Sequence, residues 1–297
     1  MRHAFLITAY NNFENLNRLL TVLDDPRSEI FLHIDSKVPQ PHDALVRPMQ
    51  AAKIHFIPSM NVKWGNISQI VCTLELIRYA LDFEWDYCHY VTESDMPLKT
   101  MDGLDHIFEK YAGWELVDFF PGAYEDARYK CEAYHWFVGF SGYRTNKLLK
   151  AANHLCAKTQ LKLGLRRKQG KCYHGSAYFS ISRDFACYCL QWQDEVYKKY
   201  RFTLATDEVW LQTLCAESPY LNRVRFLETE DFMGNLRLID WKRRSGSSPY
   251  TYQEADWEEL KNAVDQTELC FARKFTKDSV VAQRLLDYLK EGIDYGQ

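Results

Sequence analysis

The sequence predicts an α/β fold in which a mostly parallel central sheet carries helices on both faces. Short apolar segments alternate with amphipathic segments through the first hundred residues. Two of the apolar segments end at an aspartate, Asp35 and Asp95, and parallel strands end at one edge of a sheet, where ligands bind in open α/β folds. The chain has 297 residues, 46% of them hydrophobic, which is enough for one large domain. We therefore expect a single domain over residues 1–297.

The predicted strands are short runs of apolar or aromatic residues bounded by turn-forming residues. Between them, leucines and isoleucines recur every three or four residues, as on the buried face of a helix. Asn11 or Asn12 can cap the first helix. The strands are expected at residues 4–9, 29–34, 54–57 and 87–92. The helix faces are Leu16, Leu19, Leu20 and Leu23, and then Ile67, Ile70, Val71, Leu74 and Ile77.

The fourth strand ends at two carboxylates, Glu93 and Asp95, and Pro97 follows. A solvated acidic turn has the same appearance. A second interpretation is a cation site, because hard oxygen ligands at this spacing can hold Mn²⁺ or Mg²⁺ against a diphosphate. The residues alone leave both interpretations open.

The second half of the chain begins less regularly. Residues 115–171 show no clear periodicity and contain the basic cluster Arg166-Arg167-Lys168. This cluster is read as a solvated loop, with a phosphate- or acceptor-contacting loop as the alternative. A strand followed by a helix is expected from residue 175, and two helices around the loop 271–277 close the chain.

Three further charged groups are candidates for chemistry. Thr206-Asp207-Glu208 precedes an apolar helix, so it is either an ordinary helix cap or a carboxylate that takes a proton from a hydroxyl nucleophile. Arg237 lies within an apolar strand-like run, where a charge usually has a partner. Arg273 and Lys274 lie between aromatic residues that would hold them rigidly.

Composition excludes several classes. The net charge of −3 gives no reason to expect a nucleic-acid partner. No GxSxG, GxxxxGK[ST] or HExxH motif occurs, and the nine cysteines show no CxxC spacing. No apolar run approaches the roughly 20 residues of a membrane span, and no signal peptide precedes the first strand. We expect a cytoplasmic protein with reduced thiols, with the inner face of the membrane as a second location and Arg166-Arg167-Lys168 as the point of peripheral contact.

Seven short motifs then occur in a fixed order. Each motif alone is weak evidence for a family, whereas all of them in this order are strong evidence. They are residues 4–10, His33-Ile34-Asp35-Ser36-Lys37, Trp64-Gly65 before an apolar helix, residues 93–98, residues 175–183, Asp207-Glu208 and residues 271–275.

In this order the motifs resemble the core-2/I-branching β-1,6-N-acetylglucosaminyltransferase family, which also includes the peptide O-xylosyltransferases. The second motif is similar to the family's H-V-D-x-K, the fifth to G-S-x-x-F-x-x-S-R and the last to F-A-x-K-F. The similarity spans roughly residues 4 to 276. It implies a GT-A-type nucleotide-sugar-binding fold and an inverting transfer of a sugar, expected to be GlcNAc, from a UDP-sugar to an acceptor hydroxyl.

The resemblance also implies roles for single residues. Glu208 matches the general base. Arg237 and Lys274 match the cations that stabilise the leaving diphosphate, so no metal and no other cofactor is expected. Asp35 and Tyr10 match the nucleotide-binding positions. The sugar-contacting positions are Asp95, Asp207 and Glu93, with acceptor contacts over residues 125–136.

The implied partners are a UDP-sugar donor and an oligosaccharide or lipid-linked glycan acceptor, as in surface polysaccharide synthesis by a bacterial relative. Residues from about 1 to 112 would form the nucleotide-binding half, and residues from about 113 to 297 the acceptor-binding and catalytic half. Three alternatives stay open: a UDP-xylose-dependent enzyme, a metal-dependent enzyme using Glu93 and Asp95, and a nucleotide-sugar-binding protein without catalysis.

Overall fold

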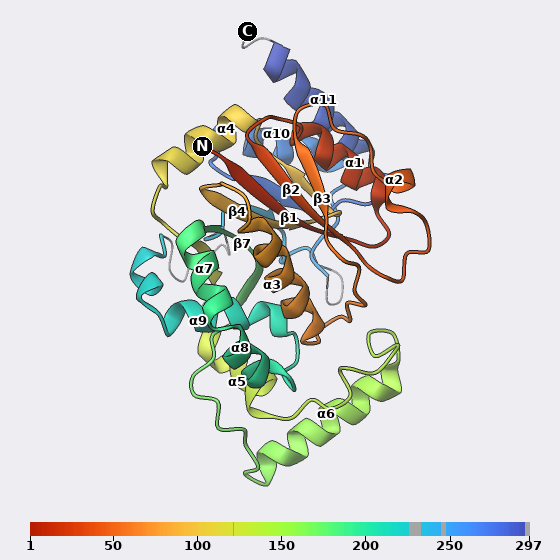
Figure 1. Ribbon diagram of the computed structural model, residues 1–297. Coiled ribbons are helices and arrows are strands. Elements are labelled where there is room, and N and C mark those ends of the chain that lie inside the picture. The colour runs from red at the N-terminus through yellow and green to blue at the C-terminus, as the bar shows by residue number, and fades with distance from the viewer. Residues whose placement is uncertain (121, 226–232, 245–247, 295–297) are drawn as a thin grey trace.

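A six-stranded sheet forms the centre of the molecule (Figure 1). The computed structural model describes residues 1–120, 122–225, 233–244 and 248–294. The strand order is β3-β2-β1-β4-β7-β6; the first four strands run parallel, and β7 is antiparallel to both of its neighbours. The predicted α/β fold with a mostly parallel sheet is confirmed. The strands are β1 (His3–Ala9), β2 (Ser28–Ile34), β3 (Lys53–Phe56), β4 (Tyr87–Thr92), β6 (Leu116–Phe119) and β7 (Gly175–Ser182).

Alternate residues of β1 enter two different cores, because successive side chains of a strand point to opposite faces. Ala4 and Leu6 pack with one layer of helices, and Phe5 and Ile7 pack with another. Helices therefore cover both faces of the sheet, as predicted. One layer contains α3 (Ser68–Ala80), α7 (Arg183–Gln191) and α9 (Trp210–Ala216), and the other contains α1 (Phe13–Val22) and α4 (Met101–Lys110).

A second, three-stranded sheet lies beside the first, in the order β5-β9-β8. The sequence interpretation treated the segment after Thr92 as a turn, whereas it continues into β5, which pairs antiparallel with β9. This pairing places Asp95 opposite Arg273, almost two hundred residues later. The elements of this sheet and its helices are β5 (Asp95–Pro97), β8 (Arg237–Ile239), β9 (Phe271–Arg273), α10 (Trp257–Gln266) and α11 (Val280–Asp294).

The region predicted to be less regular contains α5 (Ala123–Glu132) and α6 (Lys147–Lys162). The expectation for residues 115–171 was therefore wrong for α6. Its buried residues are Asn153, Ala157 and Gln160, so the buried face of the helix lacks the apolar stripe by which amphipathic helices are usually recognised. The two helices expected near the end are confirmed as α10 and α11. None of the described helices is long and apolar enough to cross a bilayer.

The remaining elements are short. Asn146 caps α6 by accepting hydrogen bonds from two backbone amides. The short elements are α2 (His42–Leu45), α8 (Gln193–Tyr200) and the 3₁₀ turns Thr206–Glu208, Pro219–Arg223 and Glu254–Asp256.

A buried polar chain crosses the central sheet. His3 Nδ1 lies 2.9 Å from His89 Nε2, and His89 Nδ1 lies 2.8 Å from the Ser180 hydroxyl. His3 Nε2 lies 2.9 Å from Asp105. Burial lowers the pKa of His3 despite the opposing effect of Asp105, and burial with neighbouring positive charge lowers the pKa of His89 well below its usual range.

This chain predicts acid-sensitive folding. Below the ordinary histidine pKa of 6.5 the unfolded chain binds protons that buried His3 and His89 do not, so the free energy of unfolding should fall as the pH drops. Each histidine contributes up to about 1.4 kcal/mol per pH unit. Urea unfolding at pH 7.5, 6.5 and 5.5 should show a shallower loss for His89→Gln than for wild type. The exposed His106→Gln is the control, and equal slopes for wild type and His89→Gln would contradict the assignment.

Candidate active site

An open cleft of about 1640 Å³ lies at the carboxyl ends of the parallel strands. Tyr10 follows β1, Asp35 follows β2 and Glu93 follows β4, and all three line this cleft. The sequence predicted that Asp35 and Asp95 would meet at this edge; Asp35 does line the cleft, whereas Asp95 does not.

Asp35 is held in a fixed orientation on one wall. Its carboxylate accepts hydrogen bonds from the backbone amides of Lys37 (2.9 Å) and Val62 (3.1 Å) and lies 3.1 Å from the Lys37 ammonium. The Tyr10 side chain is 47% exposed beside it. The wall thus offers a partly neutralised carboxylate and an aromatic ring, groups that suit a base and a ribose.

The two carboxylates after β4 have different surroundings. Glu93 lines the cleft, and burial raises its pKa to about 7, although Arg273 opposes the rise. Asp95 is absent from the cleft wall: its carboxylate lies 2.7 Å from the Arg273 guanidinium and accepts the Thr92 amide at 2.5 Å. The sugar-contacting role predicted for Asp95 is therefore corrected, because its oxygens are occupied by protein groups and it holds Arg273.

The same observation bears on a metal. A cation held by Glu93 and Asp95 would need the carboxylate oxygens of Asp95. These oxygens already accept hydrogen bonds from the Arg273 guanidinium and the Thr92 amide. Among the described residues, no group of three or more His, Cys, Asp or Glu side chains could hold a metal ion. In this arrangement Glu93 and Asp95 therefore do not present two free carboxylates to a cation.

Two adjacent cations, Arg273 and Lys274, line the cleft instead. The Arg273 guanidinium lies over the Tyr178 ring, 4.5 Å from its centroid, and pairs with Asp95. Lys274 is half-buried, and burial together with Arg273 lowers its pKa. Its ammonium has no hydrogen-bond or ion-pair partner among the described residues, so it is available to an anion. Lys274 therefore lines the cleft, and its predicted contact with a diphosphate stays a prediction.

Arg237 does not reach the cleft, so the diphosphate-binding role predicted for it is wrong in this structure. Its side chain is 2% exposed, donates to the carbonyls of Asn235 (2.6 Å) and Phe179 (2.7 Å), and lies over the Phe271 ring. Burial lowers its pKa to about 10. The expectation that a charge in an apolar strand has a partner holds, but its partners are backbone carbonyls and an aromatic face.

The acidic turn Thr206–Glu208 borders the same cleft through Asp207 and Glu208 and is held by the Trp64-Gly65 loop. The Ala205 amide donates to the Gly65 carbonyl (2.9 Å), and the Thr206 hydroxyl donates to the Asn66 carbonyl (2.9 Å). Gly65 has φ of +70°, a conformation that favours glycine, and Ala205 itself adopts φ of 49°. The glycine therefore permits the loop that positions the turn.

Glu208 lies in a cluster with Lys130 and His174. One Glu208 oxygen is 2.6 Å from the Lys130 ammonium and 3.2 Å from His174 Nε2. Burial alone would raise the pKa of Glu208, but the Lys130 charge and the His174 hydrogen bond outweigh it and hold the pKa below the usual glutamate value. About a third of the side chain faces the cleft, so an ionised carboxylate is presented to it.

Asp207 has the opposite electrostatic setting. It accepts a hydrogen bond from the Gln69 amide at 2.7 Å, and Gln69 also accepts one from the Gly65 amide. Burial and the neighbouring Glu208 charge raise the pKa of Asp207. The pKa values of the two adjacent carboxyl groups are therefore shifted in opposite directions, and Glu208 is the one whose charged form the site favours.

Sequence reasoning missed Lys130 and His174. Lys130 comes from α5, within the region predicted to contact the acceptor, and His174 precedes β7. The side chain of Glu125, which begins that predicted region, lies outside the described residues. No local pattern signals either residue, because only the fold brings them to Glu208.

The sequence from residue 3 to residue 264 matches the model of a family described as "Branch: Core-2/I-Branching enzyme". Xylosyltransferase oxt of Drosophila melanogaster is 25% identical over 334 aligned residues, which include 100% of this chain and 34% of the fly protein. The chain thus spans about a third of the length of this relative.

Two further proteins are similar. Human N-acetyllactosaminide beta-1,6-N-acetylglucosaminyl-transferase is 24% identical over 249 residues, which cover 80% of this chain and 58% of the human protein. Among solved structures, mouse xyloside xylosyltransferase 1 in its apo form aligns with 91% of this chain and 97% of its own, at 12% identity and a TM-score of 0.39.

The packing beside His174 yields a stability prediction. A Cβ atom at Gly175 would lie 1.9 Å from the Asp118 carbonyl oxygen and 2.9 Å from the Gln212 side chain. Gly175→Ala should therefore lower the free energy of unfolding by about 3 kcal/mol or more, through a shift of the β6–β7 backbone. Urea unfolding measures this loss. Gly139→Ala is the control, since its added atom meets only Asn66 at 3.5 Å; equal effects in the two variants would contradict the clash.

Proposed function

The chain belongs to the core-2/I-branching enzyme family, and we propose that it is an inverting glycosyltransferase that moves a sugar from a UDP-sugar to an acceptor hydroxyl without a metal. One observation carries the proposal: an ionised carboxylate, Glu208, and the cations Arg273 and Lys274 line the same cleft. These are the groups that a single displacement needs, namely a base for the nucleophile and positive charge for the leaving group.

The donor occupies the strand-end side of the cleft in this proposal. Tyr10 and Asp35 contact the uridine, and Glu93 contacts a sugar hydroxyl. Burial raises the pKa of Glu93 to about 7, so near neutral pH this carboxyl is divided between a form that donates and a form that only accepts hydrogen bonds. Asp95 acts indirectly, by holding Arg273.

The reaction is one displacement at the anomeric carbon. The acceptor oxygen forms the new bond to this carbon while the bond from the carbon to the UDP oxygen breaks, and the electron pair leaves with UDP. Glu208 takes the proton of the acceptor hydroxyl. The Lys130 ammonium and His174 keep Glu208 ionised before the reaction, and Asp207 supports the turn and contacts the acceptor sugar.

Charge develops on the departing UDP, and fixed cations in the cleft can stabilise it. Arg273 is oriented by Asp95 and Tyr178, and Lys274 is unpaired among the described residues. Arg273 thus takes the role that the sequence interpretation gave to Arg237. This assignment supports catalysis without a metal.

The donor sugar is proposed to be GlcNAc, with xylose as the second candidate, because relatives named for each transfer match this chain. The acceptor is proposed to be an oligosaccharide or a lipid-linked glycan. A nucleotide-sugar-binding protein without catalysis is the non-enzyme alternative, and it differs by releasing no UDP.

The base assignment predicts the effect of Glu208→Gln. The amide cannot accept the proton, so kcat for UDP release from UDP-GlcNAc or UDP-xylose with an acceptor panel should fall by about 10²- to 10⁴-fold. UDP affinity, measured by calorimetry, should change little. Glu217→Gln is the matched control, because Glu217 is exposed and pairs with Lys199 away from the cleft. Unchanged turnover in Glu208→Gln would remove the assigned base, and UDP binding without turnover in wild type would favour the binding-protein alternative.

The charge assignment predicts that Lys274→Met weakens UDP binding and lowers kcat by about 10²-fold, the size typical of losing one preorganised donor. Lys290→Met, on an exposed face of α11, should change neither quantity. Wild-type turnover should persist in excess EDTA. Loss of turnover in EDTA with recovery on adding Mn²⁺ would instead support a metal-dependent reaction.

A further inference from the structure

Helix α6 lies along the edge of the molecule opposite α11 (Figure 1). It packs weakly against the rest of the chain, because its buried residues are Asn153, Ala157 and Gln160. Much of its surface is therefore exposed, and the exposed residues include large apolar side chains. Folding gains little from these side chains, so their presence calls for a partner.

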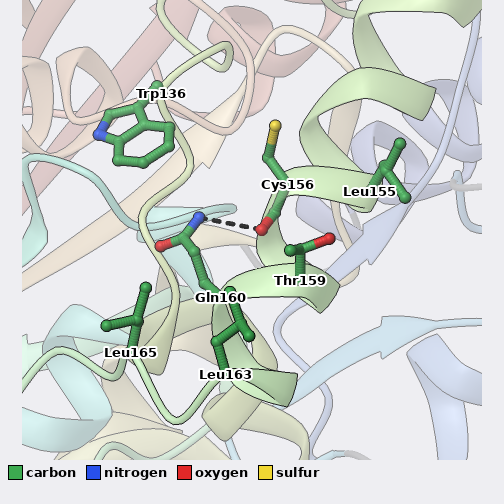
Figure 2. Close-up of a pocket in the computed structure, with 7 residues that line it drawn as sticks. All are labelled: Trp136, Leu155, Cys156, Thr159, Gln160, Leu163 and Leu165. Carbon is green, nitrogen blue, oxygen red and sulfur yellow. Dashed lines mark hydrogen bonds between the residues drawn. The ribbon is translucent and has the colours of Figure 1, made fainter.

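The apolar side chains form a continuous surface. Leu148 is 81% exposed and Leu155 is 67% exposed, and a separation of seven residues puts both on one stripe of the helix. An open hollow of about 340 Å³ adjoins Leu155 (Figure 2). Its lining residues are Trp136, Leu155, Cys156, Thr159, Gln160, Leu163 and Leu165.

The charge around this surface has one sign. No Asp or Glu occurs between Glu132 and Asp184, whereas the same segment holds ten Lys and Arg in a chain whose net charge is −3. Lys147, Lys158 and Lys162 are exposed along one flank of the leucine stripe. An exposed apolar stripe beside an unbroken basic flank is the pattern of a helix that lies in a membrane interface.

The predicted basic cluster contributes less than its sequence suggests. Arg166 pairs with Glu132 at 2.6 Å. Arg167 is buried and donates to the carbonyls of Cys131 (3.2 Å) and Lys199 (2.6 Å), so it is structural and cannot face a membrane or a phosphate. Arg166 and Lys168 are exposed, and Arg166 shares its charge with Glu132. The cluster Arg166-Arg167-Lys168 therefore offers less charge than expected for a membrane contact, and α6 is the stronger candidate.

We propose that α6 and the hollow beside it dock on an anionic lipid surface. The leucines and Trp136 enter the boundary between headgroups and acyl chains, and the lysine flank pairs with lipid phosphates. A nucleic acid would match the charge but would leave the leucines in water. Lipid therefore fits both halves of the surface.

The position of α6 gives this docking a consequence. The segment between Trp136 and α6 lines the cleft through Val138, Phe140 and Arg144. A membrane on α6 would therefore lie next to one wall of the cleft, where a glycan carried on a lipid could enter. The docking itself does not depend on the proposed reaction and is measured without it.

Vesicle co-sedimentation at low salt tests the docking. Wild type should pellet with vesicles of phosphatidylcholine and phosphatidylglycerol, much less with phosphatidylcholine alone, and progressively less as salt is added. Leu148→Gln/Leu155→Gln and Lys147→Gln/Lys158→Gln/Lys162→Gln should each weaken binding by at least about tenfold. All five positions are exposed, so the variants should fold, which urea unfolding checks.

The matched control is Val280→Gln/Lys290→Gln, which removes one exposed apolar and one exposed basic side chain from α11. It should bind like wild type. The proposal is overturned if wild type stays in the supernatant with anionic vesicles, or if the control loses as much binding as the α6 variants. Light scattering that shows a dimer, dissociated by Leu148→Gln/Leu155→Gln, would instead assign the surface to a second copy of the chain.

Discussion

The ion pair between Asp95 and Arg273 is the interaction on which the site depends. It joins the end of the central sheet to a strand almost two hundred residues later, and both side chains are largely withdrawn from water. Removing one partner of such a pair leaves an uncompensated charge, which costs about 3–5 kcal/mol. The backbone pairing of β5 with β9 surrounds the pair, so the position of Arg273 and Lys274 at the cleft is set by the fold.

The cleft lining therefore contains two electrostatically different groups. The carboxylate of Asp95 orients Arg273, which with Lys274 brings positive charge to the cleft. Lys130 and His174 partly neutralise Glu208 but leave a third of it exposed. In the proposed reaction the diphosphate would be attracted to the cations, and the hydroxyl nucleophile to Glu208.

The sequence predicted the elements that have a local periodic pattern of apolar residues. Apolar runs identified the parallel strands, and the residues after them, Tyr10, Asp35 and Glu93, do meet at one edge. It could not distinguish Arg237 from Arg273, because both lie in short apolar strands and only tertiary pairing decides which faces the cleft. Lys130 and His174 were not predicted as site residues for the same reason, because only tertiary structure brings them to Glu208. Helix α6 was not predicted because its buried positions are polar or small, so no apolar face marked a side that packs against the rest of the chain.

The electrostatic environment of Glu208 indicates which interaction would lower the barrier of the proposed reaction most. A carboxylate whose pKa is held low stays ionised over a wide pH range, but it is a weaker base than one with a higher pKa. The adjacent Asp207, with its raised pKa, would be the stronger base if basicity were limiting, yet one of its oxygens already accepts the Gln69 amide. If Glu208 is the base, as proposed, a carboxylate whose charged form is favoured gains little from an early proton transfer, and the cations at the diphosphate contribute more. In the proposed reaction the proton would then move to Glu208 late, once the acceptor oxygen has begun to bond to the anomeric carbon and its own acidity has risen.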